Sequence, residues 1–230
     1  MNPRQAPHPL ECVQSDSYFA HAFARMPVMV ILRGMDVEPT VELASWFWEL
    51  GVSLIEVPVG SARARAALAA TVEAAASAGA GEVRAVGAGT IRSEREVSEV
   101  ADAGAQFTVS PGWDGGVAQA SLDAGLPHLG GVMSPTEVHQ ATRFGLSWLK
   151  LFPASVLGPG HIRALRGPFP GVHLVATGGV DPGNARLFLE SGAGAVSFGS
   201  SAARAPRADF ETFLHDIDPA REPVPEEDPA

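Results

Sequence analysis

Hydrophobic and polar positions alternate along this chain in a regular order. Short apolar runs rich in β-branched residues are each followed by a longer amphipathic or alanine-rich stretch. Near-continuous apolar runs of this length are typical of buried parallel strands, and the stretches between them have the length of helices. We therefore predict strands at Val28–Leu32, Ser53–Val57, Val83–Ala88, Gln106–Val109, Pro127–Gly130, Ser147–Leu151, Val172–Ala176 and Ala195–Phe198.

The stretches between the strands carry signals for helix ends. Ser93 and Ser134 stand where N-caps are expected, and glycines such as Gly145 follow the helical patterns, as left-handed C-caps do. Proline after Ser134 and after Asp181 suits a first helical turn. The predicted helices are Glu38–Leu50, Ala62–Ala78, Ser93–Ala103, Gly115–Ala124, Pro135–Phe144, His161–Arg166 and Pro182–Glu190.

Strands that alternate with helices predict an α/β fold with a parallel sheet covered by helices. Eight such units in one chain favour a (β/α)8 TIM barrel, with a doubly wound open sheet as the alternative. The interior has no linker, so we predict a single barrel domain at 16–218, with an N-terminal arm or helix. Polar, Pro-rich composition predicts a flexible arm at 1–15 and a disordered acidic tail at 219–230.

Composition and charge narrow the range of partners. The chain has 230 residues, of which 46% are hydrophobic, and a formal net charge of −10 without any long basic run. Nucleic acid and membrane are therefore not expected as partners, whereas a small anionic substrate is compatible with local arginines and helix N-termini. A lone cysteine, Cys12, and an N-terminus without an apolar signal core favour a soluble cytoplasmic protein.

No metal or cofactor motif stands out. The seven histidines are scattered, and no Rossmann or Walker pattern is present, so we expect neither a metal site nor a cofactor. His128 alone lies on a predicted strand from which it could reach the interior of the barrel.

Lys150 is the only lysine, because the other 15 basic residues are arginines. It lies in an apolar run at the end of a predicted strand, which is where a TIM barrel places its active site. Lysine can form an imine with a carbonyl compound, whereas arginine does not. A snorkelling or ion-paired lysine is the structural alternative.

Polar residues and glycines collect at the same end of nearly every predicted strand. Glu56 could serve as a general acid–base beside Lys150, or it could only pair with Arg33 or cap a helix. Glycines follow the last two strands, where TIM barrels often bind phosphate through backbone N–H groups. The residues at these strand ends are Arg33-Gly34, Glu56, Gly87–Thr90, Ser110–Gly112, Lys150–Pro153, Thr177–Gly179 and Gly199-Ser200.

Together these segments resemble a known family, the class I 2-keto-3-deoxy-6-phosphogluconate/4-hydroxy-2-oxoglutarate aldolases, including the 2-keto-3-deoxy-6-phosphogalactonate aldolases. The resemblance covers about residues 28–201 in the order and spacing of the family. It rests on ILRG (31–34), IEV (55–57), GAGT (87–90), VSPG (109–112), GVMSPTE (131–137), LKLFPAS (149–155), ATGGV (176–180) and FGSS (198–201).

The resemblance implies a cytoplasmic lyase that needs no cofactor and cleaves a phosphorylated 2-keto-3-deoxy sugar acid to pyruvate and glyceraldehyde 3-phosphate. It implies Lys150 as the Schiff-base lysine and Glu56 as the proton shuttle. Other roles are implied for substrate-binding Arg33, Thr90, Pro111, Phe152 and Thr177, and for phosphate-binding Gly178, Gly179, Gly199 and Ser200. It also implies a homotrimer, to which an exposed Trp46–Trp48 segment could contribute if that segment is not core.

The sequence departs from the family pattern after Glu56. The phosphogluconate branch has a substrate-binding arginine there, but this chain continues with Pro58–Ser61, closer to the phosphogalactonate branch. Arg63 or Arg65 could replace it. Gly130 stands where the family often has proline.

Three rival functions remain open at this point. They are an imine aldolase for another keto acid such as 4-hydroxy-2-oxoglutarate, a phosphosugar isomerase or epimerase on the same fold, and a phosphate-binding barrel without catalysis. Only the imine enzymes require Lys150 to remain a lysine.

Overall fold

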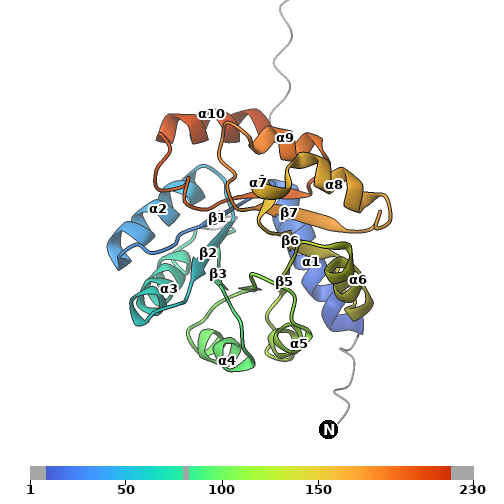
Figure 1. Cartoon of the computed structure of the whole chain (residues 1–230). Coiled ribbons are helices and arrows are strands. Elements are labelled where there is room, and N and C mark those ends of the chain that lie inside the picture. Colours follow the sequence, from blue (N-terminus) through green and yellow to red (C-terminus); the bar gives the residue numbers. More distant parts are fainter. Residues whose placement is uncertain (1–8, 80–82, 219–230) are drawn as a thin grey trace, which may run out of the picture.

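The computed structural model describes residues 9–79 and 83–218 (Figure 1). Eight parallel strands close into a barrel in which each strand pairs with its neighbours in the chain and β8 returns to β1. The (β/α)8 prediction is confirmed, and the open sheet is excluded. The strands are β1 (Val28–Ile31), β2 (Leu54–Pro58), β3 (Ala85–Gly89), β4 (Thr108–Val109), β5 (His128–Val132), β6 (Trp148–Leu151), β7 (His173–Thr177) and β8 (Ala195–Phe198).

Helices surround the barrel, and every predicted helix is present with its ends shifted by a few residues (Figure 1). α7 and α10 have no counterpart among the predictions, whereas α1 is the helical form of the predicted N-terminal arm or helix. Among the described residues, no helix combines the length and apolar character that crossing a membrane would need. The helices are α1 (Pro9–Arg25), α2 (Val37–Glu49), α3 (Ala62–Ala75), α4 (Glu94–Asp102), α5 (Gly115–Asp123), α6 (Pro135–Phe144), α7 (Ala154–Leu157), α8 (Pro159–Arg166), α9 (Ala185–Glu190) and α10 (Arg207–Ile217).

The helix ends follow the predicted chemistry in most places. Ser93 accepts a hydrogen bond from the Glu96 N–H, and Ser134 forms a capping box with Glu137 at the start of α6. Gly145 ends α6 in the left-handed conformation, with φ of 115°. α9 begins later than predicted because Asp181 and Asn184 hydrogen-bond to each other's backbone and form a turn first.

The first helix corrects the predicted arm. Residues 9–15 are helical rather than loose, because α1 closes the N-terminal end of the barrel. Phe19 and Phe23 are buried there, and Phe23 stacks on Trp148 with ring centroids 5.0 Å apart. The polar, Pro-containing sequence did not predict this helix. Its apolar residues are buried only by contact with the N-terminal end of the barrel, which the local sequence does not reveal. The rest of the predicted arm (1–8) and the predicted tail (219–230) lie outside the described residues.

The Trp46–Trp48 segment belongs to the core. Phe47 is fully buried, Trp48 is nearly so, and Trp46 packs edge-on against Phe210. The segment therefore covers the barrel from α2 and does not form an exposed apolar surface.

Side chains fill the barrel interior in layers contributed by alternate strands, as in other TIM barrels. Around the sheet, residues at the same height are offset by one residue from the paired position on each successive strand. The layer near α1 is apolar and consists of Leu54, Phe107, Trp148 and Ala195. The next layer from the same strands contains Glu56, Val109, Lys150 and Ser197, so polar chemistry begins there and faces the C-terminal mouth.

Candidate active site

Lys150 and Glu56 meet inside the barrel. Lys150 Nζ, from β6, donates a hydrogen bond to Glu56 Oε2, from β2, across 3.4 Å. Lys150 is only 4% exposed and Glu56 is fully buried. Within the part of the chain that the structure describes, the second oxygen, Glu56 Oε1, has no hydrogen-bond partner. A buried carboxylate oxygen without a partner is costly, and such groups are typical of reactive sites. The pair thus combines a sheltered amine with an acceptor that is free to receive a proton.

Two glycines leave room for this pair. A Cβ at Gly89 would overlap with the Glu56 carboxylate, and a Cβ at Gly131 would overlap with the backbone of Pro111. Gly131 pairs in register with Lys150, so the VSPG segment closes down beside the lysine strand. These close approaches explain why glycines end β3 and lie in β5.

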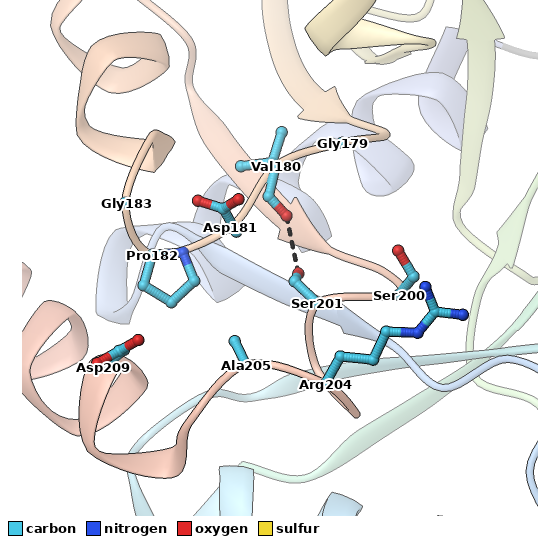
Figure 2. A pocket seen from close by; sticks show the side chains of 10 residues that line it. All are labelled: Gly179, Val180, Asp181, Pro182, Gly183, Ser200, Ser201, Arg204, Ala205 and Asp209. Atoms are coloured by element: carbon cyan, nitrogen blue, oxygen red, sulfur yellow. Dashed lines mark hydrogen bonds between the residues drawn. The ribbon is translucent and has the colours of Figure 1, made fainter.

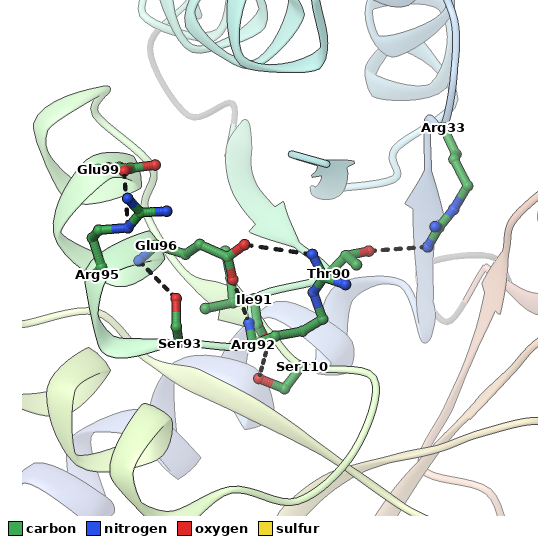
Figure 3. A network of polar contacts seen from close by, with 9 residues as sticks. All are labelled: Arg33, Thr90, Ile91, Arg92, Ser93, Arg95, Glu96, Glu99 and Ser110. Carbon is green, nitrogen blue, oxygen red and sulfur yellow. Dashed lines mark hydrogen bonds and ion pairs between the residues drawn. The ribbon is translucent and has the colours of Figure 1, made fainter. Parts of the chain in front are cut away.

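Arg33 and Thr90 also come together at the mouth. Arg33 Nη2 donates a hydrogen bond to Thr90 Oγ1 at 3.2 Å (Figure 3). Thr90 has a φ of 64°, which a β-branched residue adopts only at a cost of roughly 1–3 kcal/mol. Backbone strain of this kind is concentrated at functional sites, so the conformation supports a binding role for this residue.

The loop after Thr90 is held by polar contacts on both sides (Figure 3). Ser110 Oγ, after β4, donates to the Ile91 carbonyl at 2.8 Å, and the Arg92 N–H donates to Glu96 Oε2 at 2.7 Å. Both contacts hold the peptide unit between Ile91 and Arg92, so they oppose relaxation of the strained threonine next to it.

Arg33 and Thr90 line a recess of about 160 Å³, together with Gly34, Pro58, Gly60, Ser61 and Ala64. This size and the single guanidinium suit a carboxylate. Neither candidate for the missing arginine lines it. Arg63 instead forms an ion pair with Asp36 at 2.9 Å and donates to the Gly34 carbonyl at 3.0 Å, which secures the loop after β1.

Two further predicted substrate residues, Phe152 and Thr177, lie at the C-terminal ends of β6 and β7, the strand of Lys150 and its neighbour. The Phe152 ring centroid lies 5.8 Å from Lys150 Nζ, and Phe152 is 40% exposed at the mouth. Gly178, with φ of 93°, packs so closely on the Phe152 ring that a side chain there would collide. Thr177 is buried, accepts a hydrogen bond from Ser197 and donates to the Val175 carbonyl. The Phe152 ring thus lies near the amine, with Gly178 packed against that ring.

The loops after β7 and β8 enclose a second hollow, of about 500 Å³ (Figure 2). Of the residues predicted to bind phosphate, Gly179 and Ser200 line it, whereas Gly178 and Gly199 do not. Arg204 also lines it, on the same side as Ser200, with Asp181 and Asp209 opposite (Figure 2). No ion pair links Arg204 to another described residue, so its charge is available to an anion.

The loops around this hollow are fixed in place. Asn184 Nδ2 donates to the Gly179 carbonyl at 3.0 Å. Ser201 Oγ donates to the Val180 carbonyl at 2.8 Å, as Figure 2 shows. Ser155, on α7, donates its N–H to the Gly178 carbonyl at 3.0 Å. The glycine turn after β7 is therefore preorganised by three neighbouring segments.

His128 does not reach the site. It points outward from β5, where its Nδ1 hydrogen-bonds with Thr108 Oγ1 at 2.9 Å, and Thr108 in turn donates to Ser121 on α5. Burial lowers its pKa to about 4, against a small opposing effect of Asp114. The expectation that His128 reaches the barrel interior is wrong. Successive residues of a strand point to opposite faces of the sheet, and His128 lies at a position of β5 that faces outward.

Two residues at the site escaped the sequence prediction. Arg204 lies in a loop without periodicity, and its only signal is a cationic residue shortly after the Gly199-Ser200 pair. Ser197 lies on β8, two positions before Gly199. Because side chains alternate between the two faces of a strand, this spacing alone could have placed Ser197 inside the barrel. Groups of His, Cys, Asp and Glu that could hold a metal ion do not occur among the described residues.

Comparison with known proteins agrees with this geometry. A family model described as KDPG and KHG aldolase matches residues 20–212. A probable 2-dehydro-3-deoxy-6-phosphogalactonate aldolase of Rhizobium meliloti (strain 1021) is 35% identical over 176 residues, which cover 76% of this chain and 81% of the relative. A 2-dehydro-3-deoxy-phosphogluconate aldolase of Treponema pallidum (strain Nichols) is 34% identical, over 71% of this chain and 75% of the relative.

A solved structure described as native KDPGal is 27% identical, with a TM-score of 0.72 over 84% of this chain and 92% of that chain. The fold, the barrel-mouth lysine and these matches agree, and the chain belongs to the KDPG and KHG aldolase family.

Proposed function

We propose that this protein is a class I aldolase that cleaves a 2-keto-3-deoxy-6-phospho sugar acid into pyruvate and glyceraldehyde 3-phosphate. The observation that carries the proposal is the sheltered Lys150 amine, 3.4 Å from the Glu56 carboxylate at the C-terminal mouth of the barrel. A primary amine in an enclosed site, next to a group that moves protons, is what imine catalysis needs.

The reaction begins when the neutral amine of Lys150 attacks the C2 ketone of the substrate. The carbonyl π electrons move to oxygen, and Glu56 transfers protons so that the carbinolamine loses water and becomes a protonated imine. The absence of a hydrogen-bond partner for Glu56 Oε1 among the described residues supports this role, because that oxygen would receive and return the protons.

Cleavage follows from the imine. The C3–C4 bonding electrons flow into the protonated imine, while the Glu56 carboxylate accepts the proton of the C4 hydroxyl and C4 becomes the aldehyde carbon. Glu56 returns this proton to C3 of the resulting enamine, and water hydrolyses the imine so formed, which releases pyruvate and regenerates the amine. Because the imine withdraws electrons as a Lewis-acidic metal would, the proposed reaction requires no cofactor.

The two recesses suit the two ends of this substrate. Arg33 and Thr90 would bind the keto-acid carboxylate, with Pro111 and Phe152 packed against the imine and Thr177 near the hydroxylated carbons. The N–H groups of the loops at Gly178, Gly179, Gly199 and Ser200 would bind the phosphate, with Arg204 supplying the positive charge. The open phosphate hollow favours a phosphorylated substrate over the alternative, an unphosphorylated keto acid such as 4-hydroxy-2-oxoglutarate.

Trapping with borohydride and pyruvate tests the imine directly. Reduction of the folded wild-type protein should add one pyruvate-derived group, and peptide mapping should place it on Lys150. The N-terminal amine is the only competing amine, since Lys150 is the only lysine. Lys150→Arg should give no adduct at this position and lose essentially all cleavage activity. No adduct on folded wild type would overturn the aldolase proposal and favour a phosphosugar isomerase or a non-catalytic barrel.

Kinetics with Arg204→Gln test the phosphate site. Removal of one charge-assisted contact should raise KM for the phosphorylated substrate about tenfold or more. Unphosphorylated 4-hydroxy-2-oxoglutarate should be cleaved equally by wild type and variant. Equal kinetics on the phosphorylated substrate as well would place its phosphate elsewhere.

The assembly and location are part of the same proposal. Apolar surface is exposed around the C-terminal mouth by Met133, Phe152 and Val156. A homotrimer would cover part of this apolar surface. Light scattering after gel filtration should give three times the chain mass; a monomer would contradict the trimer. A free, buried Cys12 is compatible with the cytoplasm.

A further inference from the structure

Arg33, which would bind the keto-acid carboxylate, lies on the short loop after β1. Its side chain is exposed and donates to Thr90 Oγ1 at 3.2 Å (Figure 3). The next residue, Gly34, has a φ of 73°, and a Cβ there would meet open space. A glycine in such a position is conformationally free unless other contacts fix it. The direction of the Arg33 side chain therefore depends on what holds the backbone of this loop.

The two ends of the loop are anchored by backbone hydrogen bonds. At its start, the Leu32 N–H donates to the Glu56 carbonyl at 2.8 Å. At its end, the Asp36 carbonyl accepts from the N–H of Thr40 at 3.1 Å and from the Thr40 hydroxyl at 2.6 Å. The segment 33–35 spans the distance between these anchors and carries the guanidinium.

One side chain from the neighbouring helix holds this segment. Arg63, in the first turn of α3, donates from Nη2 to the Gly34 carbonyl at 3.0 Å and from Nε to the Met35 carbonyl at 3.5 Å. The same Nε lies 2.9 Å from Asp36 Oδ1. A guanidinium presents its donors in a fixed planar fork, so a single arginine can hold several acceptors in one arrangement.

These contacts tie together two walls of the recess that would bind the carboxylate. The loop after β1 forms one wall, and the other comes from the end of β2 and the start of α3, through Pro58, Gly60, Ser61 and Ala64. Arg63 belongs to the helix of the second wall and binds the loop of the first wall, but it does not line the recess itself. Because its charge is paired with Asp36, Arg63 is suited to fix the loop rather than to bind substrate.

We propose that Arg63 is a positioning residue that holds the loop after β1 so that the Arg33 guanidinium faces the carboxylate of the keto acid. This inference rests on the proposed aldolase function. Arg63 acts through Arg33, so its loss should weaken the binding of pyruvate and leave the chemistry of Lys150 intact. The Arg63 side chain is 56% exposed, so its contacts contribute little to overall stability and the variant should fold.

Arg63→Ala tests the proposal through borohydride trapping with pyruvate. The trapping rate is measured at low pyruvate, where it reports binding and chemistry together, and at saturating pyruvate, where it reports chemistry alone. We expect the rate at low pyruvate to fall about fivefold, as the loss of a few exposed charge-assisted contacts predicts, and the saturating rate to stay within about twofold of wild type.

Arg65→Ala is the matched control. Arg65 is an exposed arginine two positions further along α3 and does not line the recess, so this variant should trap pyruvate like wild type. Arg63→Ala is also made in an Arg33→Ala background. If Arg63 acts through Arg33, the second substitution should change the rate at low pyruvate by less than about twofold in that background.

The outcomes separate this inference from the aldolase proposal. A loss of about fivefold that recurs in the Arg33→Ala background would show that Arg63 acts on the carboxylate independently, and the inference would be wrong. Wild-type rates in Arg63→Ala, or a fall in its saturating rate, would overturn it as well. If wild type forms no adduct at all, the aldolase proposal itself fails, and this inference fails with it.

Discussion

Because Gly89 has no side chain, the Glu56 carboxylate has room to lie beside Lys150. A Cβ there would overlap with the carboxylate, so Gly89→Ala should displace Glu56 from the 3.4 Å contact with the amine. We expect kcat to fall about 10²-fold or more, as the loss of general acid–base catalysis predicts, and stability to fall by about 1–3 kcal/mol from overpacking. Steady-state cleavage assays and urea unfolding measure the two effects.

Gly171→Ala serves as the control for that prediction. A Cβ at Gly171 meets no atom within 4 Å, and its backbone lies in the ordinary region of φ, so both activity and stability should stay near wild type. Wild-type kcat in Gly89→Ala would mean that the carboxylate can work from another position.

Individual residues differ in how far the sequence predicts them. Lys150 and Glu56 were predictable because each is a charged residue inside an apolar run at a strand end, which has few structural explanations. Arg204 was not, because a loop has no periodicity that would orient its side chains. Ser197 resembles any core serine until its partner across the sheet is known, and that partner comes from register rather than from local sequence.

Among the elements, α1 is hydrogen-bonded to the start of β6 through the Asp16 carboxylate, in addition to the stacking of Phe23 on Trp148. Asp16 accepts hydrogen bonds from the Ser147 hydroxyl at 2.6 Å and from the Ser147 and Trp148 N–H groups at 3.0–3.1 Å. Asp16→Ala would leave these donors without their partner at the foot of the lysine strand. We expect a loss of about 2–3 kcal/mol in the free energy of unfolding, with near-normal kcat in the folded protein.

Chemical denaturation of Asp16→Ala alongside Asp123→Ala checks this prediction. Asp123 is exposed on α5 and accepts a hydrogen bond from Gln119 four residues earlier, so its removal should cost less than about 0.5 kcal/mol. Similar losses in the two variants would show that α1 is held mainly by its aromatic residues.

The strands were more predictable than the helices for a physical reason. Parallel strands covered on both faces require apolar residues throughout, and this pattern is visible in a single segment. α1 and α10 instead bury partial faces against residues distant in the chain, such as Phe19 against Phe107 and Phe210 against Phe47. The short apolar stripes of these two helices therefore do not predict a helix by themselves, because the barrel surface that buries them is formed by distant parts of the chain.

For the molecule as a whole, the same closure that brings eight strand ends to one mouth also buries groups between the strands and the helices. His128 is such a group, and burial keeps it neutral in the folded protein by lowering its pKa from 6.5 to about 4. The unfolded chain binds a proton at that imidazole as the pH falls below 6.5, whereas the folded barrel does not until about pH 4. Acid therefore favours the unfolded state across this window, and the stability present at neutral pH is progressively lost.

The size of this loss follows from the two pKa values and amounts to about 2 kcal/mol between pH 7.5 and pH 5. Urea unfolding at both pH values should show it in wild type. Other groups titrate in the same range, so the informative quantity is the difference between proteins: His128→Gln should lose less stability on acidification by that amount, although it starts less stable. His139→Gln, which removes an exposed histidine, should keep the full wild-type dependence. An identical pH dependence in wild type and His128→Gln would mean that the barrel opens enough around β5 to protonate His128 without unfolding.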